Sequence, residues 1–508
     1  MECADAAKQD AVGQAAQRYR RHRPERTLLY QVIEQHYPAF VAYLADSGKQ
    51  LPTHVQRAFE DYLQCGRLEH GFLRLRCERC HAEHLVAFSC KRRGFCPSCG
   101  ARRMAESAAL LVDAVLPRRP IRQWVLSFPY PLRFLFATRP AILGQVLGIV
   151  YRVIAAHLVK QAGQTPPTAR AGAVTLIQHF GSALNLNIHF HMLVLDGVYI
   201  ERPGAAPRFQ WVREPTSQQL TQLARTIARR VARCLHRQGL LEPEAEPADL
   251  ADQVCDDDPM APLLGHAITY RIAVGPHQGR KVLTLQTLPA DDFAAPGADG
   301  PGKVAGFSLH AGVAAKAGQR DKLERLCRYI SRPAVSEKRL SLLPNGCLRY
   351  HLKTPYRDGT THVIFEPLDF IAKLAALVPP PRVHLTRFHG VFAPNSRDRA
   401  FVTPARRGRG SQLAAVPDEA HERTPAEQHT AMRWAQRLKR VFKIDVTTCP
   451  ACGGAVKLIA CIEAPGVIAK ILTHLRTQGP GAARGLFPES RAPPAGGVGG
   501  VGLNAGAR

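Results

Sequence analysis

A His-Phe-His triplet is the part of this sequence whose residue types and spacing most directly suggest chemistry. His189 and His191 flank Phe190. Alternate residues of a β-strand point to the same face and lie about 6.5–7 Å apart, so two imidazoles at this spacing can converge on one metal cation. The alternative is a pair of ordinary buried histidines, because a chain with 21 histidines contains about one such triplet by chance.

A tyrosine in a basic helix is the second candidate. Tyr329 lies in the segment DKLERLCRYISRP, and helical spacing puts Lys322, Arg325 and Arg332 on its face. Cations beside a phenol stabilise its nucleophilic phenolate and bind a phosphodiester. The alternative is a core tyrosine with its hydroxyl at the surface. The pattern predicts a helix over residues 319–331.

Two Cys-x2-Cys pairs predict a structural zinc site of the ribbon type. The pairs are Cys77 with Cys80 and Cys96 with Cys99, and we expect all four thiolates to hold one ion. Four free buried thiols are the alternative. Basic residues surround the second pair and would contact DNA phosphates; they are Lys91, Arg92, Arg93, Arg102 and Arg103.

Six further residues leave other metal sites open. A second site near the ribbon would use Cys65, His70 and Cys90. Towards the other end of the chain, Cys449, Cys452 and Cys461 offer three thiolates without an obvious fourth, so a half-knuckle completed from elsewhere is the metal-binding alternative.

The charge of the chain indicates nucleic acid as its partner. Lys and Arg number 68 against 41 Asp and Glu, which gives a net charge of +27, and so basic a protein attracts polyanions. We find neither a signal peptide nor an apolar run of about 18 residues, so no membrane span is expected. The cysteines then belong to a reducing compartment, the cytoplasm, where close pairs favour metal over disulfides.

The elements that must position these groups follow from hydrophobic spacing. Residues 184–191 alternate, with Asn187 and the two histidines on one face and apolar residues on the other, which predicts a strand on the core. An amphipathic helix is predicted over residues 217–238, with Ser217 as its N-cap.

We expect five regions along the chain. They are a basic helical N-terminal region (1–64), a zinc-ribbon DNA-binding module (65–110), a domain (111–400) with insertions at 242–258 and 289–306, a basic Cys-x2-Cys region (401–477) and a disordered tail (478–508).

The ordered blocks of this sequence resemble the rolling-circle insertion-sequence transposases of the IS 91 family, which are HUH (His-hydrophobic-His) endonucleases. The blocks are RCERC…FCPSC, QWVLSFP, FGSALNLNIHFHMLVLDGV, RLCRYISRP, RYHLKTPYRDGTTHVIFEP and RFHGVFAPN. The resemblance covers roughly residues 65–394, with an echo in CPACGG at Cys449.

The resemblance implies an α+β fold, with a five-stranded antiparallel sheet flanked by helices and preceded by the zinc ribbon. Residues 111–400 would then be the nuclease domain. It implies that His189 and His191 bind a catalytic Mg or Mn, that Tyr329 is the nucleophile, and that zinc is structural. Asn187, Gln178 or a residue on the tyrosine helix would be the third metal ligand. Classical members carry a second tyrosine four residues earlier, where this chain has Arg325, so it resembles the one-tyrosine branch.

The implied activity is nicking and rejoining of single-stranded DNA at element ends through a 5′-phosphotyrosine, in the bacterial cytoplasm. Two other functions stay open. One is a plasmid-type replication initiator or relaxase, which makes the same nick. The other is a non-enzymatic zinc-ribbon DNA-binding protein, in which Tyr329 belongs to the core.

Overall fold

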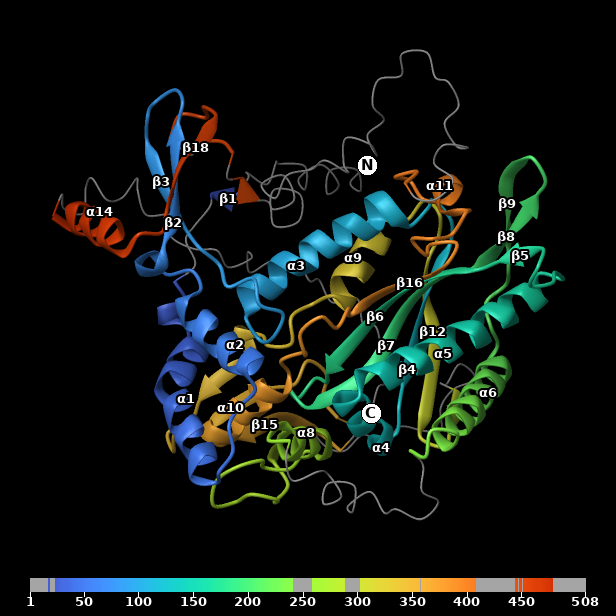
Figure 1. The fold of residues 1–508 in the computed structure, drawn as a ribbon, viewed down its shortest axis with the longest axis horizontal. Coiled ribbons are helices and arrows are strands. Elements are labelled where there is room, and N and C mark those ends of the chain that lie inside the picture. Colours follow the sequence, from blue (N-terminus) through green and yellow to red (C-terminus); the bar gives the residue numbers. More distant parts are fainter. Residues whose placement is uncertain are drawn as a thin grey trace, which may run out of the picture. The chain divides into compact units, whose positions relative to one another are not determined.

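The computed structural model describes residues 17–18, 23–240, 258–287, 302–356, 358–407, 444–445, 447–449 and 451–477. The chain forms two compact units (Figure 1). The larger contains residues 26–63 and 91–407, and the smaller contains residues 17–18, 23–25 and 64–90 together with the described residues from 444 onwards. These units cut across the expected regions, because residues 65–90 group with the C-terminal segment. The expected tail and most of both insertions lie outside the described residues.

A six-stranded antiparallel sheet forms the centre of the larger unit (Figure 1). Its order is β11 (Gly302–Val304), β12 (Phe307–Ala315), β4 (Ile121–Ser127), β7 (Leu186–Leu195), β6 (Gly172–Phe180) and β16 (Thr386–Gly390). The family resemblance implies five strands. The described sheet has six because Ala305 and Gly306, with φ of 49° and 76°, make a tight hairpin that adds β11 beside β12.

The two faces of β7 bury different side chains, as the alternation predicts. Phe190 packs edge-on against Phe128 at 5.0 Å between ring centroids, and Phe128 meets Phe136 of α4 at 4.9 Å. The opposite face carries His189 and His191. The strand starts two residues later than expected, because Leu184 has a φ of 59° and cannot continue a strand.

Helix α9 (Arg320–Ile330) covers the histidine-bearing face of the sheet, and the predicted helix over residues 319–331 is confirmed. Its apolar side, with Leu323 and Leu326, shares one core with Leu193 of β7 and with helix α3 (Pro97–Leu110). Helix α3 continues into a π-helical turn, Leu111–Val115. The tyrosine helix is therefore fixed against the strand that carries the histidines.

The remaining helices of the larger unit surround this sheet and a second one. They are α1 (Leu28–Asp46), α2 (Thr53–Gln64), α4 (Tyr130–Thr138), α5 (Pro140–Gln161), α6 (Ser217–His236), α8 (Met260–Thr269), α10 (Pro367–Ala376) and α11 (Arg399–Val402). The predicted N-cap of α6 is wrong by one residue: Thr216 caps it, because its side chain accepts from the Gln219 N–H while Gln219 bonds back, a capping box that Ser217 cannot make.

Two smaller sheets complete the larger unit. One has the order β10 (Leu283–Gln286), β15 (Thr360–Phe365), β14 (Leu348–His351) and β13 (Leu340–Leu342). The other has β5 (Ala169–Arg170), β8 (Gly197–Arg202) and β9 (Ala205–Trp211). Among the described helices, α5 is long and apolar enough to cross a membrane, but half of that stretch is buried in the fold, as in a core helix.

The smaller unit joins chain segments from both halves of the sequence. Its sheet has the order β18 (Val456–Ile462), β2 (Phe72–Cys77) and β3 (Glu83–Ala87). Helix α14 (Pro465–Thr477) packs on it through Ile468 and Leu472, against Phe72 and Leu85. The two-residue strands β1 (Gln17–Arg18) and β17 (Ile444–Asp445) pair in parallel.

Candidate active site and cysteine clusters

The two histidines of β7 converge as the sequence predicts. The Nε2 atoms of His189 and His191 lie 3.1 Å apart, and the side chains are buried, at 6% and 5% exposed. Two nitrogens that each lie about 2.1 Å from one cation, with roughly a right angle between them, are about 3 Å apart. The pair therefore has the separation that a shared cation requires.

The hydrogen bonds of the two rings leave lone pairs for a cation. His189 Nδ1 lies 2.8 Å from the Asn187 carbonyl, which only accepts, so Nδ1 donates and the neutral ring carries its lone pair on Nε2. His191 Nδ1 lies 2.7 Å from the Gln123 amide. The Gln123 amide can place either its nitrogen or its oxygen next to the ring. With the oxygen there, His191 Nδ1 donates to it and the lone pair of His191 is on Nε2, as in His189.

Both rings are neutral near pH 7. Burial lowers the pKa of His189 to about 4, with the Asn187 carbonyl opposing the shift and the nearby Arg332, Arg133 and His179 adding to it. Burial, then His189 and Arg332, hold the pKa of His191 well below its ordinary value. Neutral imidazoles are the form that binds metal.

Gln178 supplies an oxygen beside the pair. It lies opposite His189 in the β6–β7 register, and its Nε2 donates to the Ile330 carbonyl at 3.2 Å. Its Oε1 is buried and has no hydrogen-bond partner among the described residues. A buried orphan carbonyl next to two imidazoles fits a metal ligand, because a cation would satisfy it. The Oδ1 of Asn187 also has no hydrogen-bond partner among the described residues. Asn187, however, lies on the same strand as the histidines, two residues before His189, whereas Gln178 lies directly across from His189.

Tyr329 reaches the histidines from α9. Its ring meets that of His191 edge to face, with centroids 6.5 Å apart and planes at 83°. Two cations flank the phenol: the Arg332 guanidinium lies 4.4 Å and the Lys353 Nζ 4.3 Å from the ring centroid. Arg332 also donates to the Tyr329 carbonyl at 3.0 Å. Burial lowers the pKa of Lys353, and the tyrosine opposes that shift.

The basic side chains at the tyrosine differ from those expected. Arg332 is beside the ring as predicted, but Lys322 and Arg325 are exposed. Lys353 was missed, because it follows β14 and no helical spacing relates it to Tyr329. Its only signal was its place in the HLKTP part of a block shared with the family.

The predicted zinc site is wrong in its grouping. Cys77 and Cys80 are not together with Cys96 and Cys99; each pair joins other cysteines. The reason is that the two pairs lie on different elements of the fold. Cys77 ends strand β2 and Cys80 lies in the turn that leads to β3, whereas Cys96 is the N-cap of helix α3 and Cys99 is in its first turn.

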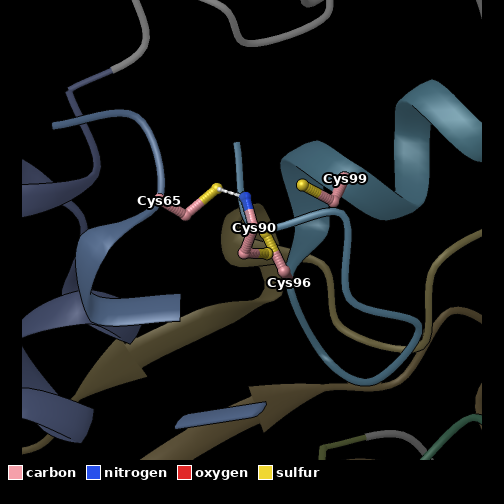
Figure 2. A group of neighbouring side chains, drawn as sticks. All are labelled: Cys65, Cys90, Cys96 and Cys99. Atoms are coloured by element: carbon pink, nitrogen blue, oxygen red, sulfur yellow. Dashed lines mark hydrogen bonds between the residues drawn. The ribbon is translucent and has the colours of Figure 1, made fainter. Parts of the chain in front are cut away.

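Cys96 and Cys99 gather with Cys65 and Cys90. Figure 2 shows the four thiols turned towards one another, and all four sulfurs lie within 4.8 Å of each other. The Cys90 N–H donates to Cys65 Sγ at 3.3 Å. The expected partner His70 is exposed and outside this group. The distances suit four thiolates around one zinc.

Cys77 and Cys80 gather with Cys449 and Cys452. Their sulfurs also lie within 4.8 Å of one another. The C-terminal pair is thus completed from elsewhere, which the sequence left open, and Cys461 is exposed, with its thiol facing Glu463.

Several basic residues of the expected DNA-binding group bond within the protein. Arg92 pairs with Asp61, Arg93 donates to the Pro380 carbonyl at 3.1 Å, and Arg103 donates to the Lys91 carbonyl at 2.7 Å. Arg102 pairs with Glu106 at 3.1 Å. These bonds fix the loop before α3, on which Lys91 is exposed.

Comparisons with known protein families match two regions of the chain, one with the histidines and the tyrosine and one with the N-terminal cysteines. Residues 172–399 match a family described as "Putative transposase", and residues 32–128 match a family described as "Transposase zinc-binding domain". The first span holds His189, His191 and Tyr329. The second holds the six N-terminal cysteines of the two clusters but not Cys449 or Cys452. No curated protein and no solved structure matches the chain.

Proposed function

The chain belongs to the transposases of the IS 91 family, and on that premise we propose that it nicks and rejoins single-stranded DNA through Tyr329. The observation that carries the proposal is the contact of the Tyr329 ring with His191, whose Nε2 lies 3.1 Å from that of His189. A core tyrosine would need neither two neutral imidazoles nor two cations beside it.

The residues that would hold the catalytic cation are His189, His191 and Gln178. The two imidazole nitrogens lie 3.1 Å apart, and Gln178, whose carbonyl oxygen is an orphan, pairs with His189 across the two strands. This donor set suits Mn at least as well as Mg. A divalent cation bound there would polarise the scissile phosphate and offset its developing charge. Gln178 also ties that place to the tyrosine helix through the Ile330 carbonyl.

Tyr329 would act as the nucleophile. Its phenol oxygen attacks phosphorus, the bond from phosphorus to the 3′-oxygen breaks, and the proton lost by the phenol is balanced by the one gained at the 3′-OH. The product is a 5′-phosphotyrosine and a free 3′-OH. One phosphate diester replaces another, so attack by a 3′-OH on this linkage rejoins DNA without ATP.

Arg332 and Lys353 would bind the phosphodiester and stabilise the phenolate. Both cations lie within 4.4 Å of the centre of the phenol ring. Arg332 also stacks over Phe180 at 5.5 Å, which fixes its direction. Fixed positive charge near the reacting phosphate lowers the barrier without reorganisation during the reaction.

A single tyrosine limits the reaction to one covalent DNA end per chain at a time. Arg325 occupies the position of the second tyrosine, and it is exposed on α9. We infer that cleavage and rejoining alternate on Tyr329 rather than proceed on two phosphotyrosines together.

The partner that we propose is DNA, as single strands at the ends of the element. The net charge of +27 favours a polyanion, and structural zinc is supported by the zinc-binding family and the thiol clusters. The loop with Lys91 would contact phosphates, with Arg92, Arg93, Arg102 and Arg103 holding its shape. We place the protein in the cytoplasm, where its DNA is.

A nicking assay tests this function. Wild-type protein with Mn²⁺ or Mg²⁺ should cleave a single-stranded oligonucleotide that carries the sequence flanking the gene, and Tyr329→Phe should bind that DNA without cleaving it. Binding without cleavage by both proteins would favour a non-enzymatic DNA-binding function. The absence of element ends, as terminal repeats, in the DNA flanking the gene would favour a replication initiator or relaxase, which makes the same nick.

A further inference from the structure

The C-terminal segment is a structural part of the smaller unit. Strand β18 pairs with β2 along its length, from Val456 opposite Cys77 to Ile462 opposite Phe72. Helix α14 then packs on the same small core. The segment that carries Cys449 and Cys452 is therefore held beside the turn that carries Cys77 and Cys80.

The four sulfurs have the separations of a tetrahedral zinc site. Cys77 Sγ lies 3.5 Å from Cys452 Sγ, and Cys80 Sγ lies 3.6 Å from Cys449 Sγ. Four sulfurs about 2.3 Å from a zinc ion are about 3.8 Å apart, whereas bonded sulfurs are about 2.05 Å apart. The distances thus match shared coordination rather than two disulfides.

The two turns are built alike around their sulfurs. The Arg79 N–H points to Cys77 Sγ at 3.4 Å, and the Gly454 N–H points to Cys452 Sγ at 3.4 Å. Both bonds come from the residue two positions after the cysteine. Backbone donors of this kind stabilise thiolates, because they place partial positive charge beside the sulfur.

The glycines of the second turn leave room for the sulfurs. Gly453 has a φ of 72°, which favours glycine. A Cβ on Gly454 would lie 2.8 Å from the Arg79 Cβ and 3.0 Å from Cys77 Sγ. Any side chain at this position would push the two turns apart, so the sequence CPACGG suits a turn closed onto another thiol pair.

We propose that Cys77, Cys80, Cys449 and Cys452 bind one structural zinc ion. This ion joins the turn after β2 to the C-terminal segment that precedes β18. Binding releases the thiol protons to solvent and involves no change of oxidation state. The site is separate from the group of Cys65, Cys90, Cys96 and Cys99, so each chain holds two thiolate-bound zinc ions. Its ligands come from positions more than 360 residues apart, and half of them lie outside the matched zinc-binding region.

Zinc counting in the full-length chain tests the proposal. The background is His189→Ala with His191→Ala, so that only thiolate-bound zinc is counted, and the protein is kept reduced. We expect two zinc ions per chain, one for each thiol group, and about one in either Cys77→Ser or Cys449→Ser. The control Cys461→Ser, which changes an exposed cysteine in strand β18 of the same unit, should keep two.

Double variants distinguish one shared site from two separate ones. Cys77→Ser with Cys449→Ser should lose the same single ion as either change alone, whereas Cys96→Ser with Cys449→Ser should lose both. Two ions retained in Cys449→Ser would overturn the proposal. So would the loss of both ions in Cys77→Ser with Cys449→Ser while Cys77→Ser alone loses one.

Two measurements keep every cysteine and so do not depend on the folding of a cysteine variant. Cobalt-substituted protein should show the absorption of four-thiolate Co²⁺ at an intensity equal to two ions per chain; an intensity equal to one, or a Cys77–Cys452 disulfide by mass spectrometry, would contradict the site. Gly454→Ala should lose zinc to a chromophoric chelator about tenfold faster than wild type. Gly466→Ala, where a Cβ meets nothing within 4 Å, should match wild type.

Discussion

The rings of His191 and Tyr329 meet edge to face, with centroids 6.5 Å apart and planes at 83°. One side chain comes from the central strand β7 and the other from helix α9, and Leu193 and Leu326 lie in the core that joins the two elements. The proposed nucleophile and one proposed metal ligand are therefore held together by a packed interior, which suits chemistry that needs fixed distances.

Replacing Gln178 should weaken binding of the catalytic cation. Gln178→Ala removes the orphan carbonyl oxygen beside His189, so we expect affinity for Mn²⁺ to fall about tenfold or more, within the range for losing a supporting group. Titration followed by Mn²⁺ electron paramagnetic resonance measures this directly.

Asn187→Ala is the matched control for that change. It removes an orphan oxygen carried by β7 itself, two residues before His189, and we expect Mn²⁺ affinity within about twofold of wild type, because a group that does not bind the cation contributes little. A larger loss in Asn187→Ala than in Gln178→Ala would reassign the third ligand.

Lys353 should matter more for nicking than the basic residues on the exposed side of α9. Lys353→Met removes a cation 4.3 Å from the Tyr329 ring centroid, and we expect the single-turnover cleavage rate to fall on the order of 100-fold. Lys353→Arg should recover part of the rate. Lys322→Met, an exposed change on α9, should leave the rate nearly unchanged, and equal losses in both Met variants would remove Lys353 from the site.

Acid should destabilise the larger unit over a defined range of pH. Burial lowers the pKa of His389 to about 4, against 6.5 when exposed. The unfolded chain then binds more protons than the folded chain between these values, so this contribution is complete above pH 6.5 and is lost as pH falls to 4. His389→Gln should keep a partner for Thr175 Oγ1 and flatten the fall in melting temperature across that range. An unchanged pH dependence would mean that His389 does not contribute.

The residue between the histidines should be structural. Phe190 is fully buried against Phe128, so Phe190→Ala should cost about 3–5 kcal/mol and speed amide hydrogen exchange along β7. Phe190→Leu should cost less and should retain nicking, since it leaves both imidazoles in place. Loss of nicking in a stable Phe190→Leu variant would give this side chain a direct role in the reaction.

Short-range patterns predicted the parts of the site that lie on single elements. Alternation along β7 put His189 and His191 on one face, because this depends on the geometry of one strand. Helical spacing also put Arg332 beside Tyr329, although α9 ends at Ile330 and Arg332 lies just beyond it. The same rules placed Lys322 and Arg325 on the tyrosine face as well, but they cannot tell which part of a wide helical face is packed and which is open to solvent.

The grouping of the cysteines and the position of Lys353 depend on contacts between segments far apart in the sequence, which local patterns do not predict. All the Cys-x2-Cys pairs have the same spacing, so nothing local states that Cys77 and Cys80 join Cys449 and Cys452; the pairing of β18 with β2 decides it. Lys353 likewise depends on where the chain goes after β14. The cap of α6 was missed for a local reason, because Thr216 and Ser217 are both good caps and only Thr216 has Gln219 at the position that closes the box.

Formation of a covalent protein–DNA adduct tests the central claim most directly. Wild type is incubated with Mn²⁺ and an oligonucleotide of the flanking sequence, labelled at its 3′ end, so that the fragment joined through its 5′-phosphate carries the label. We expect an adduct that survives SDS and that peptide mass spectrometry maps to Tyr329, with none in a Tyr329→Phe variant that still binds the DNA. An adduct of equal yield in Tyr329→Phe, or one mapped to another residue of the wild type, would contradict the account.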